Sequence, residues 1–275
     1  MDEQPKLRPS GSKLAYIPGA ETIGRIDPWW GLVVLAIGLT VILVTVRADP
    51  FWDILLFVRD GIGVTALITI SSFALTLVVG LIGGLGRLAR NWFLHGIATL
   101  YVEIVRGIPL LVQLIWWYFA FPVVIQQIGE WLHISVIANY QANPIFTAII
   151  AITVCYGAYM SEIYRAGIQS IPKGQIEAAR SLGMTHFQSM RHIILPQAVR
   201  VVLPPVGNEF VALLKDSCLV SVVAVADLTR RGREFMAVHF NPIEVWTMVA
   251  LLYLVMTLFA SSGVAWIEKK SRFER

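Results

Sequence analysis

Residues 177–196 read EAARSLGMTHFQSMRHIILP, a polar stretch between two long apolar segments. Pro172 stands shortly before it, and Gly183 divides it. Proline is favoured in the first turn of a helix and glycine just past its last turn. The sequence therefore predicts two short helices, the first ending at Gly183 and the second at Pro196. We call residues 170–197 the elbow.

The second helix of the elbow carries its own start signal. Thr185 and Gln188 have the spacing of a capping box, in which each side chain bonds to the backbone of the other residue. The apolar residues that follow share one helical face: Phe187, Met190 and Ile194. An amphipathic loop lying on a membrane would show the same spacing, so the pattern alone leaves the role of the elbow open.

Around the elbow the chain is strongly apolar. Hydrophobic residues make up 56% of its 275 residues and charged residues 15%, against about 25% charged in soluble domains. A helix needs about 20 residues to cross the hydrocarbon core of a bilayer. The sequence predicts an all-α integral membrane protein with six crossings: Trp29–Val46, Ile62–Leu85, Ile108–Ile125, Ile145–Ile163, Val199–Leu228 and Val245–Ile267.

Lysine and arginine are distributed unequally between the segments that join these crossings. If the N-terminus is inside, the outer segments hold only Arg47, Arg59, Arg230, Arg231 and Arg233. The positive-inside rule then places the elbow and both chain ends in the cytoplasm, as expected for a multi-pass membrane protein. Residues 1–28 and 268–275 are expected to be cytoplasmic tails, the first of them flexible.

Two further segments carry local signals. Trp92–Val105 follows Asn91, a favourable N-cap, and is predicted to be an interfacial helix. Gly107 and Pro109 predict a bend between it and the next crossing. The outer loop of residues 126–143 contains no lysine or arginine, which fits either a docking surface or a loop that lies along the membrane.

Polar residues interrupt the crossing of residues 199–228. Pro204 and Pro205 predict a broken helix there. A charge at the bilayer centre costs about 2.5–3.5 kcal/mol on insertion scales, so these polar groups should face protein or water. A substrate path or gate explains them, and so does a buried ion pair that fixes packing. The candidate path residues are Glu103, Arg106, Glu162, Asn208, Glu209, Lys215 and Ser217.

Several kinds of chemistry lack a sequence signal. No Gly-Lys pair occurs, so the chain has no phosphate-binding loop of the Walker A type. The histidines show no metal-ligand spacing, and Cys155 and Cys218 fit small buried side chains better than a disulfide or a metal site. The net charge of +4 reflects membrane topology, without a basic stripe for nucleic acid. We expect no catalytic residue, metal site or cofactor in this chain.

The elbow resembles the EAA loop of the membrane subunits of binding-protein-dependent ABC importers. The matching residues are Glu177, Ala178, Ala179, Gly183, Ile193, Leu195 and Pro196. Residues 101–113, 161–165 and 213–217 are similar to the polar amino acid permease group of that family. Ile108 and Cys218 depart from the threonine and the small polar residue that the group usually has at these positions.

The resemblance implies a five-helix, MetI-like type I core over residues 60–267, with residues 29–46 as an additional N-terminal helix. It also implies that the elbow is a coupling loop, which docks on two separate ATPase subunits that bind ATP and magnesium. A second permease chain, identical or related, and a soluble substrate-binding protein would complete the importer. Glutamine, glutamate, basic amino acids, cystine and opines all remain open as substrates.

Two other classes of function compete with this interpretation. A secondary transporter driven by an ion gradient would explain the charged residues in a crossing. It would leave the elbow unexplained, and no inverted repeat is visible. A membrane enzyme would need a convergent set of catalytic side chains, and the sequence contains none.

Overall fold

The computed structural model describes residues 28–271, and over this range every regular element is a helix. Of the two expected tails, residues 1–27 and 272–275 lie outside the described residues. Residues 268–271, expected to belong to the C-terminal tail, are instead the last turn of α12. The elements are α1 (Pro28–Val46), α2 (Ala48–Leu88), α3 (Trp92–Gly107), α4 (Leu110–Ile115), η1 (Trp116–Ala120), α5 (Phe121–Trp131), α6 (Ser135–Ala138), α7 (Pro144–Gln169), α8 (Lys173–Ser181), α9 (His186–Ser189), η2 (Met190–Ile194), α10 (Leu195–Asp216), η3 (Ser217–Val222), α11 (Leu228–His239) and α12 (Pro242–Ser271).

Four helical segments are long and apolar enough to cross a membrane: Ala48–Leu88, Leu110–Trp131, Pro144–Gln169 and Pro242–Lys270. The apolar helix Trp30–Val46 is shorter. Helix α10 is the sixth long element but is less apolar, because it carries Arg200, Glu209, Lys215 and Asp216. The predicted all-α membrane fold is confirmed.

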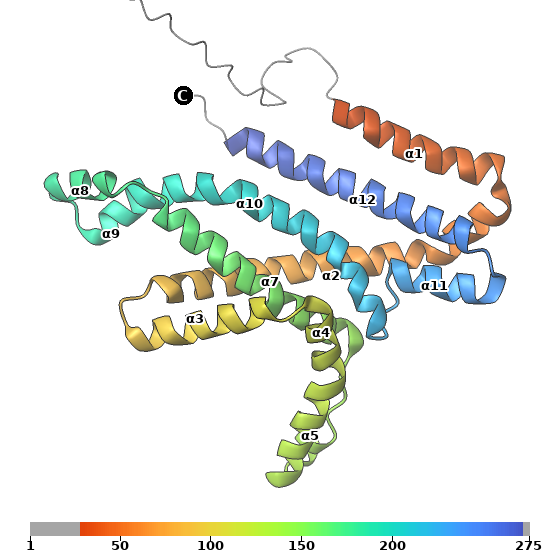
Figure 1. Cartoon of the computed structure of the whole chain (residues 1–275), viewed down its shortest axis with the longest axis horizontal. Coiled ribbons are helices and arrows are strands. Elements are labelled where there is room, and N and C mark those ends of the chain that lie inside the picture. Colours follow the sequence, from red (N-terminus) through yellow and green to blue (C-terminus); the bar gives the residue numbers. More distant parts are fainter. Residues whose placement is uncertain (1–27, 272–275) are drawn as a thin grey trace, which may run out of the picture.

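Helices α2 and α7 form the centre of the molecule (Figure 1). Glycines allow them to lie in close contact. A Cβ on Gly80 would lie 2.5 Å from Cβ of Met160, and one on Gly84 would lie 2.9 Å from the carbonyl oxygen of Ser161. Small residues permit such backbone approach in membranes, where van der Waals packing holds helices together.

Helix α2 has 41 residues and begins well before the predicted crossing at Ile62. Its first third is buried against the helices that follow the elbow, in a cluster that includes Phe51, Ile54, Val58, Leu228 and Met248. The prediction was too short because this segment contains Arg59 and Asp60, which lower its apparent hydropathy although the opposite face is buried. On the far side, α1 packs along α12 through Val33, Ala36 and Leu258 (Figure 1).

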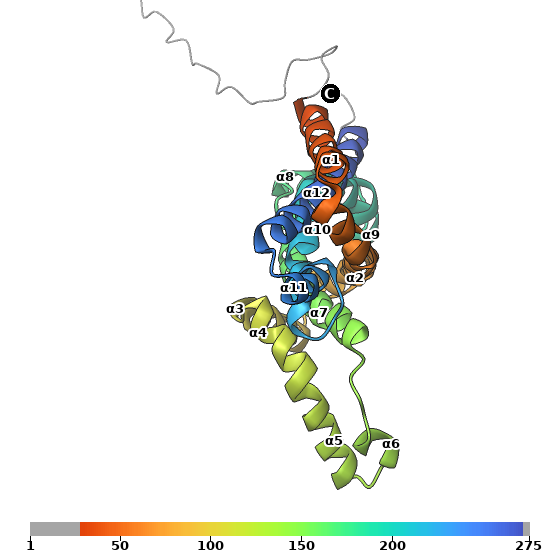
Figure 2. The ribbon, with the colours of Figure 1, turned by 90° about the vertical axis from the view of Figure 1, so that its right-hand side faces the viewer.

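The predicted bend after α3 is present. The Asn91 side chain accepts hydrogen bonds from the backbone of Phe93 and Leu94 at the start of the helix. Ile108 is extended, and the Gln113 amide donates to its carbonyl oxygen at 2.8 Å. Beyond the bend, α4, η1 and α5 continue into an arm that projects from the other helices and ends at α6 (Figure 2).

Pro204 and Pro205 do not break a helix, in contrast to the prediction. They lie inside α10, which continues to Asp216 before it tightens into the 3-10 turn η3. A proline inside a helix removes one backbone hydrogen bond, and the bonds of the flanking turns can hold the helix together. The interruption of the polar segment therefore lies at Ser217, three turns after the prolines.

Candidate coupling elbow and polar path

The elbow lies at one end of the molecule (Figure 1). Its first helix, α8, follows Pro172 and contains Glu177, Ala178 and Ala179. Gly183 has a φ of 76°, a left-handed conformation that glycine adopts without a steric penalty. Its amide donates to the carbonyl of Arg180 at 2.9 Å, and the next amide, of Met184, donates to Ala179 at 3.1 Å. These two bonds make a Schellman motif, so the predicted glycine stop is confirmed.

The second helix of the elbow begins at the predicted capping box. The Thr185 backbone amide donates to Gln188 Oε1 at 2.8 Å, and the Gln188 amide donates to Thr185 Oγ1 at 3.3 Å. The predicted end at Pro196 is wrong. Helix α9 passes through the π-helical turn η2 directly into α10, with Pro196 in its first turn. Proline is tolerated there because the wider turn alters the hydrogen-bond pattern that its missing N–H would otherwise interrupt.

A small apolar cluster attaches the elbow to the two long helices that flank it. Its buried members are Ile171, Ile194 and Ala198, and Ile168, Ile176 and Met190 pack against them. These residues come from the last turn of α7, the turn that follows it, α8, η2 and the start of α10. The end of α7, the elbow and the beginning of α10 therefore form one packed unit, in which Ile193 is half-buried.

The free side of the elbow combines polar and apolar groups. Glu177 and Ala178 are exposed, whereas Ala179 is fully buried. Two large apolar side chains near the Gly183 turn are exposed as well, Leu182 at 81% and Phe187 at 71%. The sequence analysis placed Phe187 on an apolar face and did not mark Leu182. Leu182 and Phe187 could have been identified from the sequence by their position beside the glycine turn, in an otherwise polar segment. Leu195 and Pro196 are also exposed.

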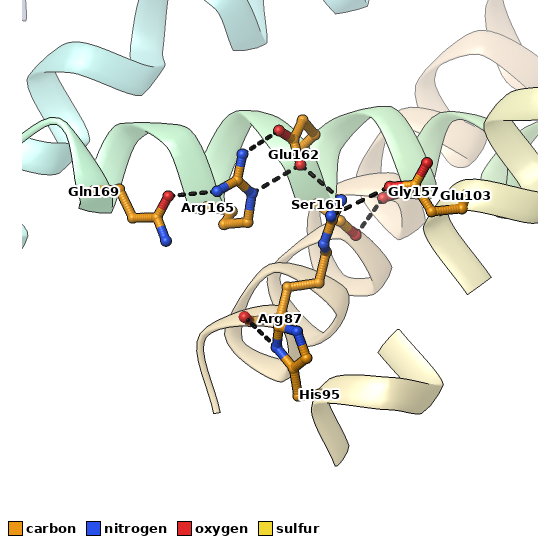
Figure 3. A network of polar contacts seen from close by, with 8 residues as sticks. All are labelled: Arg87, His95, Glu103, Gly157, Ser161, Glu162, Arg165 and Gln169. Carbon is orange, nitrogen blue, oxygen red and sulfur yellow. Dashed lines mark hydrogen bonds and ion pairs between the residues drawn. The ribbon is translucent and has the colours of Figure 1, made fainter. Parts of the chain in front are cut away.

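Glu162 is the centre of a polar network between α2, α3 and α7 (Figure 3). Arg87 Nη1 of α2 donates to Glu162 Oε2 at 2.8 Å, and Arg165 Nε donates to the same oxygen at 2.9 Å. Arg165 also donates to Glu162 Oε1 and to Gln169. Arg87 Nη2 reaches Glu103 Oε1 of α3 at 3.3 Å. Two predicted path residues, Glu103 and Glu162, are thus brought together.

Arg106 lies in the last turn of α3, one turn after Glu103. Its guanidinium lies over the ring of Tyr159, 5.2 Å from the centroid. The Arg106 side chain is exposed, so it remains open to a further ligand. Glu209 of α10 is half-buried. The predicted path residues Arg106 and Glu209 thus supply one exposed cation and one half-buried carboxylate.

Other predicted path residues on α10 differ in their surroundings. Asn208 and Lys215 are exposed, and the Lys215 ammonium makes no ion pair with any residue in the described range 28–271. Ser217 is buried, and its hydroxyl donates to the Leu214 carbonyl at 2.7 Å. Ser217 is therefore a helix-end residue, without a free group for a substrate.

Two tyrosines and two arginines of this region were not among the predicted path residues. Tyr156 donates to Asp216 Oδ2 at 2.7 Å, and its ring lies 6.2 Å from that of Tyr159. Tyr156, Tyr159, Glu162 and Arg165 follow one another at intervals of three on α7, so each is a neighbour of the next in a row that winds around the helix. That spacing is the signal that identifies them. Arg87 has no such local signal.

A second ion-pair group lies at the end of the molecule opposite the elbow. Arg231 of α11 donates to Asp60 of α2 at 3.0 Å and to Glu234 at 2.9 Å. Hydrogen bonds from Arg230, at 2.8 Å, and from Arg231 lower the pKa of the Glu234 carboxyl from 4.5. The bond between Arg231 and Asp60 fixes α11 to the long helix α2. No group of three or more metal-ligating side chains occurs among residues 28–271.

Comparison with known proteins agrees with this architecture. Residues 76–273 match the family described as "Binding-protein-dependent transport system inner membrane component". Over 224 residues the chain is 34% identical to the glutamine transport system permease protein GlnP of Escherichia coli (strain K12), covering 82% of this chain and 97% of that protein. It is 37% identical to the L-cystine transport system permease protein TcyB of Bacillus subtilis (strain 168), over 81% of this chain and 88% of that protein.

Solved structures show the same fold. The structure titled "Crystal structure of an amino acid ABC transporter with histidines" superposes with a TM-score of 0.70 at 34% identity, over 83% of this chain and 97% of that one. An inward-facing MetNI methionine ABC transporter superposes with a TM-score of 0.64 at 21% identity, over 80% and 99%. This chain belongs to the family of inner membrane components of binding-protein-dependent transport systems. That membership favours a permease subunit over a gradient-driven secondary transporter.

Proposed function

We propose that this chain is the permease subunit of an ATP-driven importer of polar amino acids, and that its elbow is the site at which a separate ATPase subunit docks. One observation supports the docking site above all. The elbow exposes the large apolar side chains of Leu182 and Phe187 and also Glu177, while its inner side is packed against α7 and α10. Exposed large apolar side chains in a polar segment are typical of a protein interaction site.

Each of the seven EAA-loop residues has a place in this proposal. Glu177 supplies a polar contact, and Ala178 lets the partner backbone approach closely. Ala179, with no exposed surface, packs α8 against the elbow. Gly183 sets the turn between the helices. Ile193, Leu195 and Pro196 lead the second helix into α10.

Coupling follows from the way in which the elbow is attached. When two ATPase subunits close on ATP and magnesium, each moves the elbow that it holds. Because the elbow, the end of α7 and the start of α10 pack through the cluster around Ile171 and Ile194, both helices must follow. The elbow is then a two-state element biased by a ligand bound elsewhere.

The substrate path is proposed for the region around Arg106, Tyr159 and Glu209. An amino acid carries a carboxylate, which the guanidinium of Arg106 complements, and an ammonium group, which the carboxylate of Glu209 complements. Asn208 and Lys215 are further exposed polar residues on α10, the helix that carries Glu209. The permeases named for glutamine and L-cystine transport support an amino acid as the cargo.

The remaining parts of the proposed importer are other chains. A second permease, identical or related, completes the path, and a soluble binding protein delivers the substrate. The excess of lysine and arginine beside the elbow supports its placement in the cytoplasm, with both chain ends on that side of the bacterial inner membrane.

Reconstitution tests this function. The chain is co-expressed with a candidate ATPase and placed in liposomes with and without its binding protein. We expect a stable complex whose ATP hydrolysis rises when loaded binding protein is added. Uptake driven by a sodium or proton gradient through the chain alone would contradict the proposal and favour a secondary transporter.

A further inference from the structure

A chain of five polar side chains links the elbow to the helices that precede it. It runs from Gln169 through Arg165 and Glu162 of α7 to Arg87 of α2 and Glu103 of α3 (Figure 3). Gln169 is the last residue of α7, directly before the elbow. Within the described residues, Arg87–Glu162 is the ion pair that joins α7 to another helix.

Glu162 is fully occupied by this network. Its Oε2 accepts from Arg87 and Arg165, and its Oε1 accepts from Arg165 again. A carboxylate held between two guanidinium groups is already neutralised, and binding a substrate ammonium would require breaking charge-assisted bonds. The geometry therefore assigns Glu162 a role in joining helices, separate from the substrate path around Arg106.

The two connections made by Arg87 differ in strength. Its contact with Glu162 is 2.8 Å long, and the two side chains are 14% and 26% exposed. Its contact with Glu103 is 3.3 Å long, and the Glu103 side chain is 64% exposed. Water screens an exposed pair much more than a partly buried one. The contact with Glu103 is thus the weaker connection.

Packing beside the network has the same asymmetry. Gly80, Gly83 and Gly84 of α2 lie directly against Met160 and Ser161 of α7, so these two helices are closely interlocked. Helix α3 is held to α7 by the hydrogen bond from Tyr101 to the Val154 carbonyl at 2.7 Å, whereas Glu103 lies on its exposed side. A displacement of α7 is therefore expected to carry α2 with it and to change the contact between Arg87 and Glu103.

We propose that Arg87, Glu162 and Arg165 are positioning residues that transmit movement of the elbow to α2 and α3, and that the Arg87–Glu103 pair is the contact that opens and closes during transport. We call these four residues the relay. The inference rests on the proposed docking of an ATPase at the elbow. Glu103 and Glu162, which the sequence suggested for the substrate path, then act in coupling instead.

The test separates coupling from substrate recognition. The complex is reconstituted with its ATPase and binding protein, and ATP hydrolysis is measured against the concentration of loaded binding protein. In Glu162→Gln we expect the maximal stimulation by substrate to fall about fivefold or more, with the half-saturating concentration unchanged. Glu103→Gln should act in the same direction, and because its side chain is 64% exposed, we expect this variant to fold normally. Glu130→Gln, an exposed acid in the projecting arm, is the matched control.

Each outcome has a distinct meaning. Full maximal stimulation in both relay variants, or a change confined to the half-saturating concentration, would overturn the relay and leave the docking of the ATPase intact. If the unchanged chain forms no complex with an ATPase, the proposed function fails and the relay fails with it. If Glu162→Gln does not assemble, Glu103→Gln decides the matter alone.

Discussion

Gly167 of α7 lies directly against Val202 of α10, so closely that a methyl group on Gly167 would overlap Cγ1 of Val202. Val202 is 8% exposed, and as a β-branched residue it has few rotamers into which it can turn away. This contact lies next to the apolar cluster of the elbow. Helices α7 and α10, which flank the elbow, therefore pack against each other there without space for a further methyl group.

The first prediction follows from that contact. Gly167→Ala should destabilise the protein by about 1–3 kcal/mol, the usual cost of overpacking, and should lower the thermal unfolding midpoint in detergent. Gly263→Ala of α12, where a Cβ meets nothing within 4 Å, is the control and should be neutral or slightly stabilising. Equal midpoints for the two variants would contradict the tight α7–α10 contact.

Gly183 permits a second matched comparison within the elbow. With φ at 76°, Gly183→Ala should cost about 1–2 kcal/mol of local stability, because a Cβ is unfavourable in the left-handed region. Gly174→Ala in α8 has open space and no such backbone conformation. Hydrogen exchange of the elbow amides measures the difference. We expect faster exchange in Gly183→Ala alone.

Charge reversal at Glu177 tests docking. Glu177→Lys should weaken co-purification of the ATPase and lower its stimulation by substrate, because the exposed carboxylate is proposed to contact the partner. Leu182→Ser and Phe187→Ser should add to the loss by removing the exposed apolar pair. Glu130→Lys in the projecting arm is the control. Retention of the ATPase by the triple variant would show that docking occurs elsewhere.

The polar path is tested on α10. Glu209→Ala and Lys215→Ala should each abolish most substrate uptake by liposomes while the complex with the ATPase still assembles. The charge of Glu209 is needed to balance Arg106 and the ammonium group of the substrate. Assembly is followed by size-exclusion chromatography and uptake with labelled amino acid. Unchanged uptake in both variants would remove α10 from the path.

Glu234 gives a pH prediction at the opposite end of the molecule. Its pKa is lowered in the folded protein by Arg230 and Arg231, so its ionised form stabilises the fold above the unfolded pKa of about 4.3. This stabilisation is lost as the pH falls through the lower folded value. It should be small, at most about 1 kcal/mol for so exposed a pair. The thermal unfolding midpoint of Glu234→Gln should therefore lack the fall at low pH that the Glu234 carboxylate causes. The midpoint of Glu130→Gln should keep it.

Much of the elbow could be predicted from the sequence, because its signals are local. The positive φ of Gly183 and the capping box of Thr185 and Gln188 depend on residues within one or two turns of each other. Hydropathy likewise identified the long apolar helices, since each must be apolar along its own length. The continuous helix through Pro196 was missed because a π-helical turn has no local sequence signal of comparable strength.

The sequence by itself determined that this is a helical membrane protein with a polar elbow, because backbone conformation and membrane insertion are set by neighbouring residues. Only the tertiary structure decided which charges meet. Glu162 pairs with Arg87, 75 positions away, because glycines let α2 and α7 approach closely at that height. Glu162, which the sequence suggested for a substrate path, is therefore bonded to two arginines. Which charge it pairs with depends on long-range packing, and neighbouring residues do not reveal it.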